Sequence, residues 1–181
     1  MNSILRRRRG LMRKKDEAGP VYLYRNGETL PELGSLSLLG FNSNTGYNKI
    51  EYSGTSIHYW NTSTSSVASI KGARTLTFQN QLSANYAGKK MYSKLRHKNT
   101  STNTIEDYAG VYISDAVTDS TNLTDAFTGR SGALKKITTT DNSYTEYINS
   151  YTISKGGYVS IIVRKNGAGE TNWYIDEVWI E

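Results

Sequence analysis

The side chains that could perform catalysis are few in this chain, and their spacing does not bring them together. His58 and His97 are the two histidines, and neither stands at a metal-ligand spacing. Glu146, Asp176 and Glu177 are carboxylates on predicted strands, but a glycosidase needs two carboxylates that face each other across a cleft. Neighbouring residues of a strand point to opposite sides, so Asp176 and Glu177 diverge. No nucleophile or phosphate-loop motif is present, and we therefore expect no catalytic residues and no enzyme.

Basic side chains that could bind phosphate or an acidic partner are concentrated at the N-terminus. Residues 1–17 contain seven bases and two acids, a charge of +5, so the rest of the chain supplies only +1 of the net +6. Each arginine offers a two-pronged donor that suits phosphate groups. An apolar stripe of Ile4, Leu5, Leu11 and Met12 runs through the arginines at the seven-residue offset of one helical face. A helix this short is unstable alone, so we expect it to order on a partner.

We therefore predict that residues 1–19 form a docking arm that binds another protein. The predicted docking residues are Ile4, Leu5, Arg6, Arg7, Arg8, Arg9, Leu11, Met12 and Arg13. Nucleic-acid binding is the second interpretation of the arm, although the rest of the chain shows no basic stripe and no reader motif. A targeting presequence, a nuclear address and an anionic-lipid patch are further alternatives for such a run.

The remaining elements are predicted to be strands. The chain has no cysteine, which excludes disulfides and cysteine-ligated zinc, and its apolar stretches are far shorter than the ~20 residues of a membrane helix. Gly19-Pro20 ends the arm, and from residue 21 the apolar residues alternate with a period of two. The predicted strands are 21–25, 49–53, 56–60, 74–80, 89–97, 109–114, 134–140, 144–154, 158–165 and 173–181.

This spacing of short strands and glycine-rich turns predicts an all-β body, an antiparallel jelly-roll sandwich of about 8–10 strands, over residues 20–181. A short helix near 81–87 or 120–127 is an additional expectation. The polar stretches 98–107 and 115–133 are predicted to be long loops, which are common places for binding surfaces on a rigid β scaffold.

The last thirty residues carry a resemblance to a known fold family. Tyr151-Thr-Ile-Ser, a Gly-Gly turn, Tyr158-Val-Ser-Ile-Ile-Val and Trp173-Tyr-Ile-Asp-Glu-Val-Trp-Ile-Glu resemble the closing hairpin of jelly-roll carbohydrate-binding modules and galactose-binding-like sandwiches. The resemblance implies a jelly-roll body. It also implies a structural calcium held by the closing-strand aspartate, here Asp176, with Asn26 and Glu28 as possible partners, since calcium prefers carboxylate and carbonyl oxygens.

Sugar binding requires flat aromatic faces beside planar polar groups. The candidate glycan-binding residues are Tyr59, Trp60, Tyr92, Tyr112 and Trp173. Tyr59 and Trp60 are neighbours on one predicted strand, so they cannot both point at one ligand. Most large aromatic residues are buried, and for each candidate a place in the core is the alternative to a ligand role.

The first 28 residues carry a second resemblance. Met1-Asn-Ser-Ile-Leu-Arg-Arg-Arg-Arg-Gly-Leu-Met and Tyr22-Leu-Tyr-Arg-Asn-Gly-Glu resemble the openings of small virion and tail proteins of bacteriophages that infect Firmicutes. The resemblance implies a virion structural protein, present in many copies or as a homo-oligomer, whose arm is anchored in the particle and whose body binds host-surface glycan. Two alternatives remain: a capsid or neck cement protein that binds no sugar, and a stand-alone carbohydrate-binding module of a polysaccharide-active system.

Overall fold

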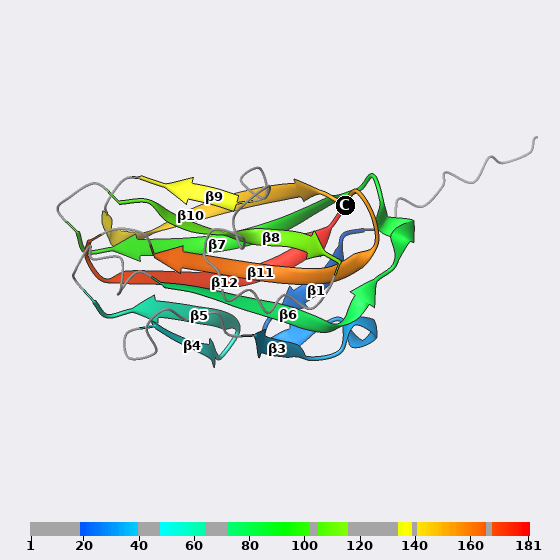
Figure 1. The fold of residues 1–181 in the computed structure, drawn as a ribbon, viewed down its shortest axis with the longest axis horizontal. Helices are drawn as coiled ribbons and strands as arrows, with labels where there is room; N and C mark the ends of the chain where they lie inside the picture. The colour runs from blue at the N-terminus through cyan, green and yellow to red at the C-terminus, as the bar shows by residue number, and fades with distance from the viewer. Residues whose placement is uncertain are drawn as a thin grey trace, which may run out of the picture.

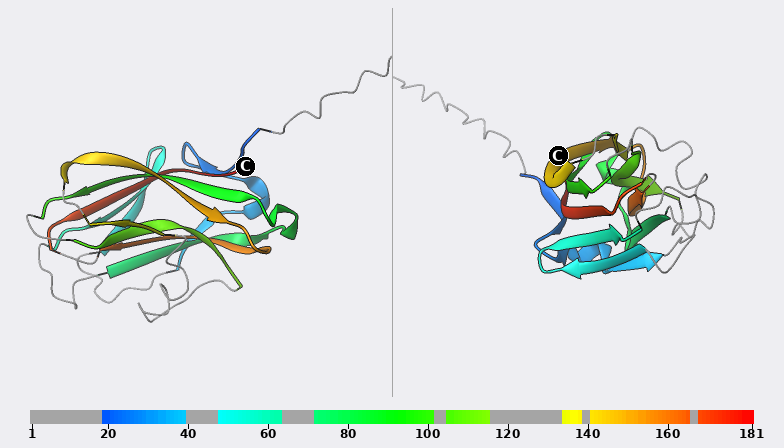
Figure 2. Two further views of the ribbon diagram at one scale, coloured as in Figure 1. Left: turned by 90° about the horizontal axis from the view of Figure 1, so that it is seen from above. Right: turned by 90° about the vertical axis from the view of Figure 1, so that its left-hand side faces the viewer.

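The protein is described by a computed structural model covering residues 19–39, 48–63, 72–101, 105–115, 134–138, 141–165 and 168–181. These residues form two antiparallel β-sheets stacked face to face, which Figure 2 shows edge-on as separate layers. The predicted all-β sandwich is confirmed. Among the described residues, no helix is long and apolar enough to cross a membrane.

Sheet A follows the order β10-β7-β12-β1-β2, with β5 and β4 added beside β12 (Figure 1). Its strands are β10 (Asp141–Thr152), β7 (Lys90–Asn99), β12 (Thr171–Ile180), β1 (Val21–Arg25), β2 (Glu28–Thr29), β5 (Ser56–Asn61) and β4 (Asn48–Ser53). The closing strand β12 changes partner halfway: residues 171–175 pair with β5, and residues 177–180 pair with β1. Its other edge pairs with β7 throughout, with a register shift between Ile175 and Glu177.

Sheet B follows the order β3-β6-β11-β8-β9. Its strands are β3 (Leu36–Leu39), β6 (Gly72–Leu82), β11 (Gly157–Lys165), β8 (Asp107–Ser114) and β9 (Leu134–Ile137). Two single turns of 3-10 helix, η1 (Pro31–Leu33) and η3 (Ala84–Tyr86), flank the strands. The Ser83 hydroxyl accepts from the backbone N–H of Asn85 and so caps the start of η3.

The core lies between the sheets and is built from alternate residues of each strand, because side chains along a strand point to opposite faces. β12 contributes Trp173, Ile175, Val178 and Ile180, all essentially inaccessible to solvent. Burying such side chains away from water is the main favourable contribution to folding.

One end of the interior is polar. The Asp107 carboxylate lies 3.0 Å from Nε2 of His97 and accepts hydrogen bonds from Asn99 Nδ2 at 2.9 Å and from Thr171 Oγ1 at 2.8 Å. All four residues are buried, and the hydrogen bonds compensate for the loss of hydration. At the same end, Gly169 has a φ of +81°, and a side chain there would collide with Asn99 and the backbone of Ser101.

Each of the ten predicted strands overlaps an observed strand, because the apolar alternation of each segment matches its burial. Two short strands, β2 and β3, were not predicted. The expected helix near 81–87 is the single turn η3. The predicted docking arm, except for Gly19, and the expected helix at 120–127 lie outside the described residues.

Candidate binding face on sheet A

The outward side of sheet A gathers aromatic and charged side chains from β4, β5, β12, β7, β10 and β1; we call it the outer face. The strand registers arrange these side chains in four rows that run across the strands. Within a row, directly opposite residues on neighbouring strands project to the same side, and some long side chains, such as those of Arg96 and Glu146, also reach the next row.

The first row consists of Lys49, Trp60, Asn172 and Lys98, opposite one another on β4, β5, β12 and β7. Tyr144 of β10 extends the row, since the Lys98 ammonium lies 5.7 Å from the centre of its ring. The Lys49 ammonium lies 5.9 Å from the centre of the Trp60 ring. Tyr144 is 45% exposed, which makes it the most open aromatic side chain among the described residues of this face.

The second row runs through Glu51, His58, Tyr174, Arg96 and Glu146. His58 stacks on Tyr174 with ring centres 4.2 Å apart and an angle of 2° between the ring planes. The Arg96 guanidinium lies 4.6 Å from the centre of the Tyr174 ring, a cation–π contact. The faces of these two aromatic rings are therefore occupied within the protein.

The two rows are joined by a stack of three rings. His58 also stacks on Trp60 at 4.6 Å, and its Nε2 lies 3.0 Å from Oδ1 of Asn172. Among the described residues, Trp60 stacks with no other ring, so its second face is not covered by an aromatic side chain. Tyr144 meets Tyr174 edge to face at 5.4 Å, and partial burial and a hydrogen bond to Tyr174 raise the pKa of Tyr144 to about 12. Its hydroxyl is thus protonated at neutral pH.

The third row is held by ion pairs. Nε and Nη2 of Arg96 donate to the two carboxylate oxygens of Asp176, each at 2.7 Å, and the Ser56 hydroxyl donates to Asp176 at 2.6 Å. Burial alone would raise the pKa of Asp176, but the hydrogen bonds from Arg96 and Ser56 outweigh it and lower the pKa. Beside them, Lys94 pairs with Glu146 at 3.0 Å.

The fourth row is aromatic and lies at the other end of β12. Trp179 stacks with Tyr92 at 5.2 Å and contacts Tyr22 at 6.4 Å. The Arg25 guanidinium lies 4.3 Å from the centre of the Tyr22 ring. An open cavity of about 280 Å³ adjoins this row. Its lining residues are Tyr22, Arg25, Asn26, Glu28, Thr29, Leu30 and Pro31.

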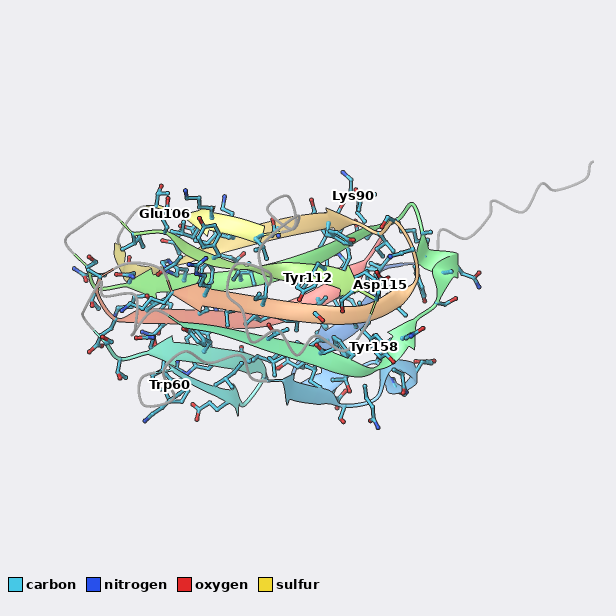
Figure 3. The ribbon with its side chains drawn as sticks, viewed as in Figure 1. Trp60, Lys90, Glu106, Tyr112, Asp115 and Tyr158 are labelled. Atoms are coloured by element: carbon cyan, nitrogen blue, oxygen red, sulfur yellow. The ribbon has the colours of Figure 1, made fainter. Side chains whose placement is uncertain are left out.

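The structure separates the five predicted glycan-binding residues. Trp60 and Tyr92 lie on the outer face, in the first and the fourth row. Tyr59 and Trp173 are 0% exposed, and both pack in the core on the inward side of the same strands. Tyr112 is 1% exposed on β8 of sheet B (Figure 3). At these three positions the ring has no accessible face: Tyr59 and Trp173 belong to the core, and Tyr112 belongs to a separate buried cluster with Leu134 and Ile162.

The predicted calcium residues lie near the point where β12 changes partner. Asn26 lies in the turn between β1 and β2, and Glu28 lies in β2. Arg25, which precedes Asn26, pairs with Glu177, the residue after Asp176 in β12. Both oxygens of Asp176 are bound by Arg96, so a calcium ion there would have to displace a guanidinium. Within the described ranges, no group of three or more His, Asp or Glu side chains is arranged to hold a metal. Calcium at Asp176 stays a prediction.

Sequence reasoning missed most of this face. Tyr174 and Trp179 stand in the same strand as Trp173, and Tyr144 and Arg96 stand in strands that pair only in the folded protein. The alternation along β12 could have found Tyr174, because Trp173 and Ile175 form a strongly apolar inward pair. Nothing in the sequence fixes the register that brings Arg96 over Tyr174.

No family model matches the chain, and no curated protein matches it significantly. Among solved structures, the K3 cleaved adhesin domain of Lys-gingipain from Porphyromonas gingivalis has a TM-score of 0.51 at 12% identity, covering 81% of this chain and 90% of that one. The enzymatically active domain of tailspike protein 4 of bacteriophage CBA120 has a TM-score of 0.50 at 13% identity, covering 88% of this chain.

The chain spans only 21% of the length of that tailspike chain. CBM29_1, a family 29 carbohydrate-binding module from Piromyces equi, has a lower TM-score of 0.45 at 14% identity, covering 89% of each chain. At these identities, the first two structures show a similar fold and nothing more, and in the tailspike the similarity covers only the matched part of its chain.

Proposed function

We propose that this protein is a non-catalytic glycan-binding module that uses the outer face of sheet A. The observation that carries the proposal is the first row, where the ring of Trp60 lies beside the amide of Asn172 and the half-exposed ring of Tyr144 lies beyond Lys98. A sugar ring combines an apolar C–H face with hydroxyl groups at its edge. It is therefore bound by open aromatic faces next to planar hydrogen-bonding groups.

The second row supports the first without using its own ring faces. His58 and Tyr174 are stacked and capped by Arg96, so they hold Trp60 and Tyr144 in fixed orientations. Rings whose positions are fixed before binding lose little conformational entropy when a ligand arrives. The geometry therefore suits recognition of a ligand, with no chemical change to it.

The proposed setting is a bacteriophage virion, where residues 1–19 anchor the protein and many copies display the outer face to the host surface. The Arg-rich opening of the chain and the tailspike domain among the structural neighbours support this setting. Weak single sites become effective there, because multiple copies bind one polymer together. Deleting residues 1–17 and counting copies per particle tests the anchor: undiminished incorporation would refute it.

The binding proposal is tested by titrating full-length protein, multimerised on beads, against a glycan array. We expect Trp60→Ala to weaken binding about tenfold, as lost ring stacking implies. Tyr108→Ala is the matched control, because Tyr108, like Trp60, has a lysine ammonium 5.9 Å from its ring centre, here that of Lys136, but lies on sheet B. The proposal fails if the wild-type protein binds no glycan at high valency, or if both variants bind equally well.

A further inference from the structure

We infer that the first row binds the carboxylate groups of an acidic polysaccharide, such as a polymer that contains uronic acid residues. The inference rests on the proposed function and names the class of glycan. Its basis is a separation of charge on the outer face: among the described residues, no carboxylate lies within ion-pair distance of the first-row cations, whereas the cations of the neighbouring rows are paired.

The other cations of the first three rows are neutralised inside the protein. Arg96 is bound to Asp176, and Lys94 is bound to Glu146. Lys49 and Lys98 differ, since no carboxylate of the described residues lies within 4.0 Å of either ammonium, and each instead lies near an aromatic ring. Within the described part of the chain, the first row therefore carries two ammonium groups outside ion pairs and contains no acidic residue.

The second row, which adjoins the first, contains the acidic residues Glu51 and Glu146. The Glu51 carboxylate lies 3.5 Å from Nδ1 of His58, and Glu146 is held by Lys94. Both carboxylates are therefore already engaged by a side chain of the second or third row. An anionic ligand would meet Lys49 and Lys98 without displacing a carboxylate, so it would not need to break an existing ion pair.

The spacing of the two lysines suits a polymer. Lys49 and Lys98 stand on β4 and β7, three strand spacings apart, which is about 14 Å. Trp60 and Asn172 lie between them, and Tyr144 lies beyond Lys98. Because Oδ1 of Asn172 faces His58, its amide N–H groups point elsewhere and can donate to a sugar oxygen. A chain laid across the strands would thus meet ring, amide and ammonium in turn.

The experiment compares polyuronates with their own carboxyl-reduced forms, which keep the linkages and hydroxyl groups but lose the charge. The full-length protein is titrated with polygalacturonate, alginate and hyaluronan and with the reduced form of each. We expect at least one polyuronate to bind about tenfold more tightly than its reduced form, and the difference to shrink as salt is added.

The matched variants are Lys49→Gln/Lys98→Gln and Lys89→Gln/Lys90→Gln, which remove the same charge. Lys90 lies at the end of the molecule opposite to Trp60 (Figure 3). We expect the first double variant to lose about tenfold in affinity for the polyuronate and to bind reduced forms unchanged. The second double variant should bind both like wild type.

Equal losses in both variants would overturn the inference, because they would indicate a general effect of net charge. Binding of neutral glycans, with no preference for the charged forms, would also overturn it and would leave the proposed function standing. If no polymer of either kind binds, and none binds on the array, the proposed function itself fails.

Discussion

The inward and outward sides of β5, β7 and β12 are built from alternate residues of the same three segments, yet they treat polar groups differently. Inside, Asp107 is enclosed with His97, Asn99 and Thr171. Outside, the polar groups are long charged side chains laid over aromatic rings, such as Arg96 over Tyr174. The inner side is specialised for stability, and the outer side exposes rings and charges at a comparatively small cost in stability.

Deleting one large ring from each side gives the strongest test of the difference between the inward and the outward side. We expect Trp173→Ala to lower the free energy of unfolding by about 4 kcal/mol, because it empties a fully buried site. Trp60→Ala should cost about 1 kcal/mol or less, since surface substitutions remove little packing. Urea denaturation of both variants measures the difference. Similar losses would mean that Trp60 also belongs to the core.

This contrast also shows how far the sequence alone could lead. The alternation along each segment predicts the strands and the sandwich, because burial on one side of a strand leaves a period of two. The alternation does not show which of two adjacent aromatic residues faces inward; of Tyr59 and Trp60, for example, only Tyr59 does. The sequence therefore pointed to the right strands, while three of the five aromatic residues chosen on them proved to be buried.

The four rows of side chains on the outer face could not be predicted from the sequence either. They depend on register between strands far apart in the chain: β4 and β5 precede β12 by more than a hundred residues. A shift by one residue would turn every side chain to the other side, and only packing in the folded state excludes it. The same dependence brings His58 between Trp60 and Tyr174.

Asp107 lies on the inward side of β7 and β12 and Asp176 on the outward side, so their removal should have different effects. Asp107→Ala should cost about 3 kcal/mol, because it leaves the donors of Asn99 and Thr171 buried without their carboxylate. Asp176→Ala should cost about 1 kcal/mol or less, since the guanidinium of Arg96 is partly exposed and can be hydrated. Thermal and urea unfolding measure both. A larger loss for Asp176→Ala would reverse the proposed division of roles.

The smallest expected effect is a pH dependence on the outer side. The hydrogen bonds from Arg96 and Ser56 hold the pKa of Asp176 below its unfolded value. Its contribution to stability is therefore fully present above about pH 4 and is lost as the pH falls through the folded pKa. In urea unfolding, wild type should exceed Asp176→Asn in stability at pH 7, and the gap should narrow at pH 3.

The control for this effect is the same substitution in the Arg96→Gln background, where the main charge partner of Asp176 is absent. There we expect the gap between the aspartate and asparagine forms to be smaller at pH 7 and to change less with acid. A gap that is independent of pH in both backgrounds would contradict the lowered pKa. If the stability difference narrows as expected, the charge of Asp176 that holds Arg96 over Tyr174 is removed by acid. Sugar binding through Trp60 and Tyr144, whose rings Tyr174 helps to position, should then weaken over the same pH range.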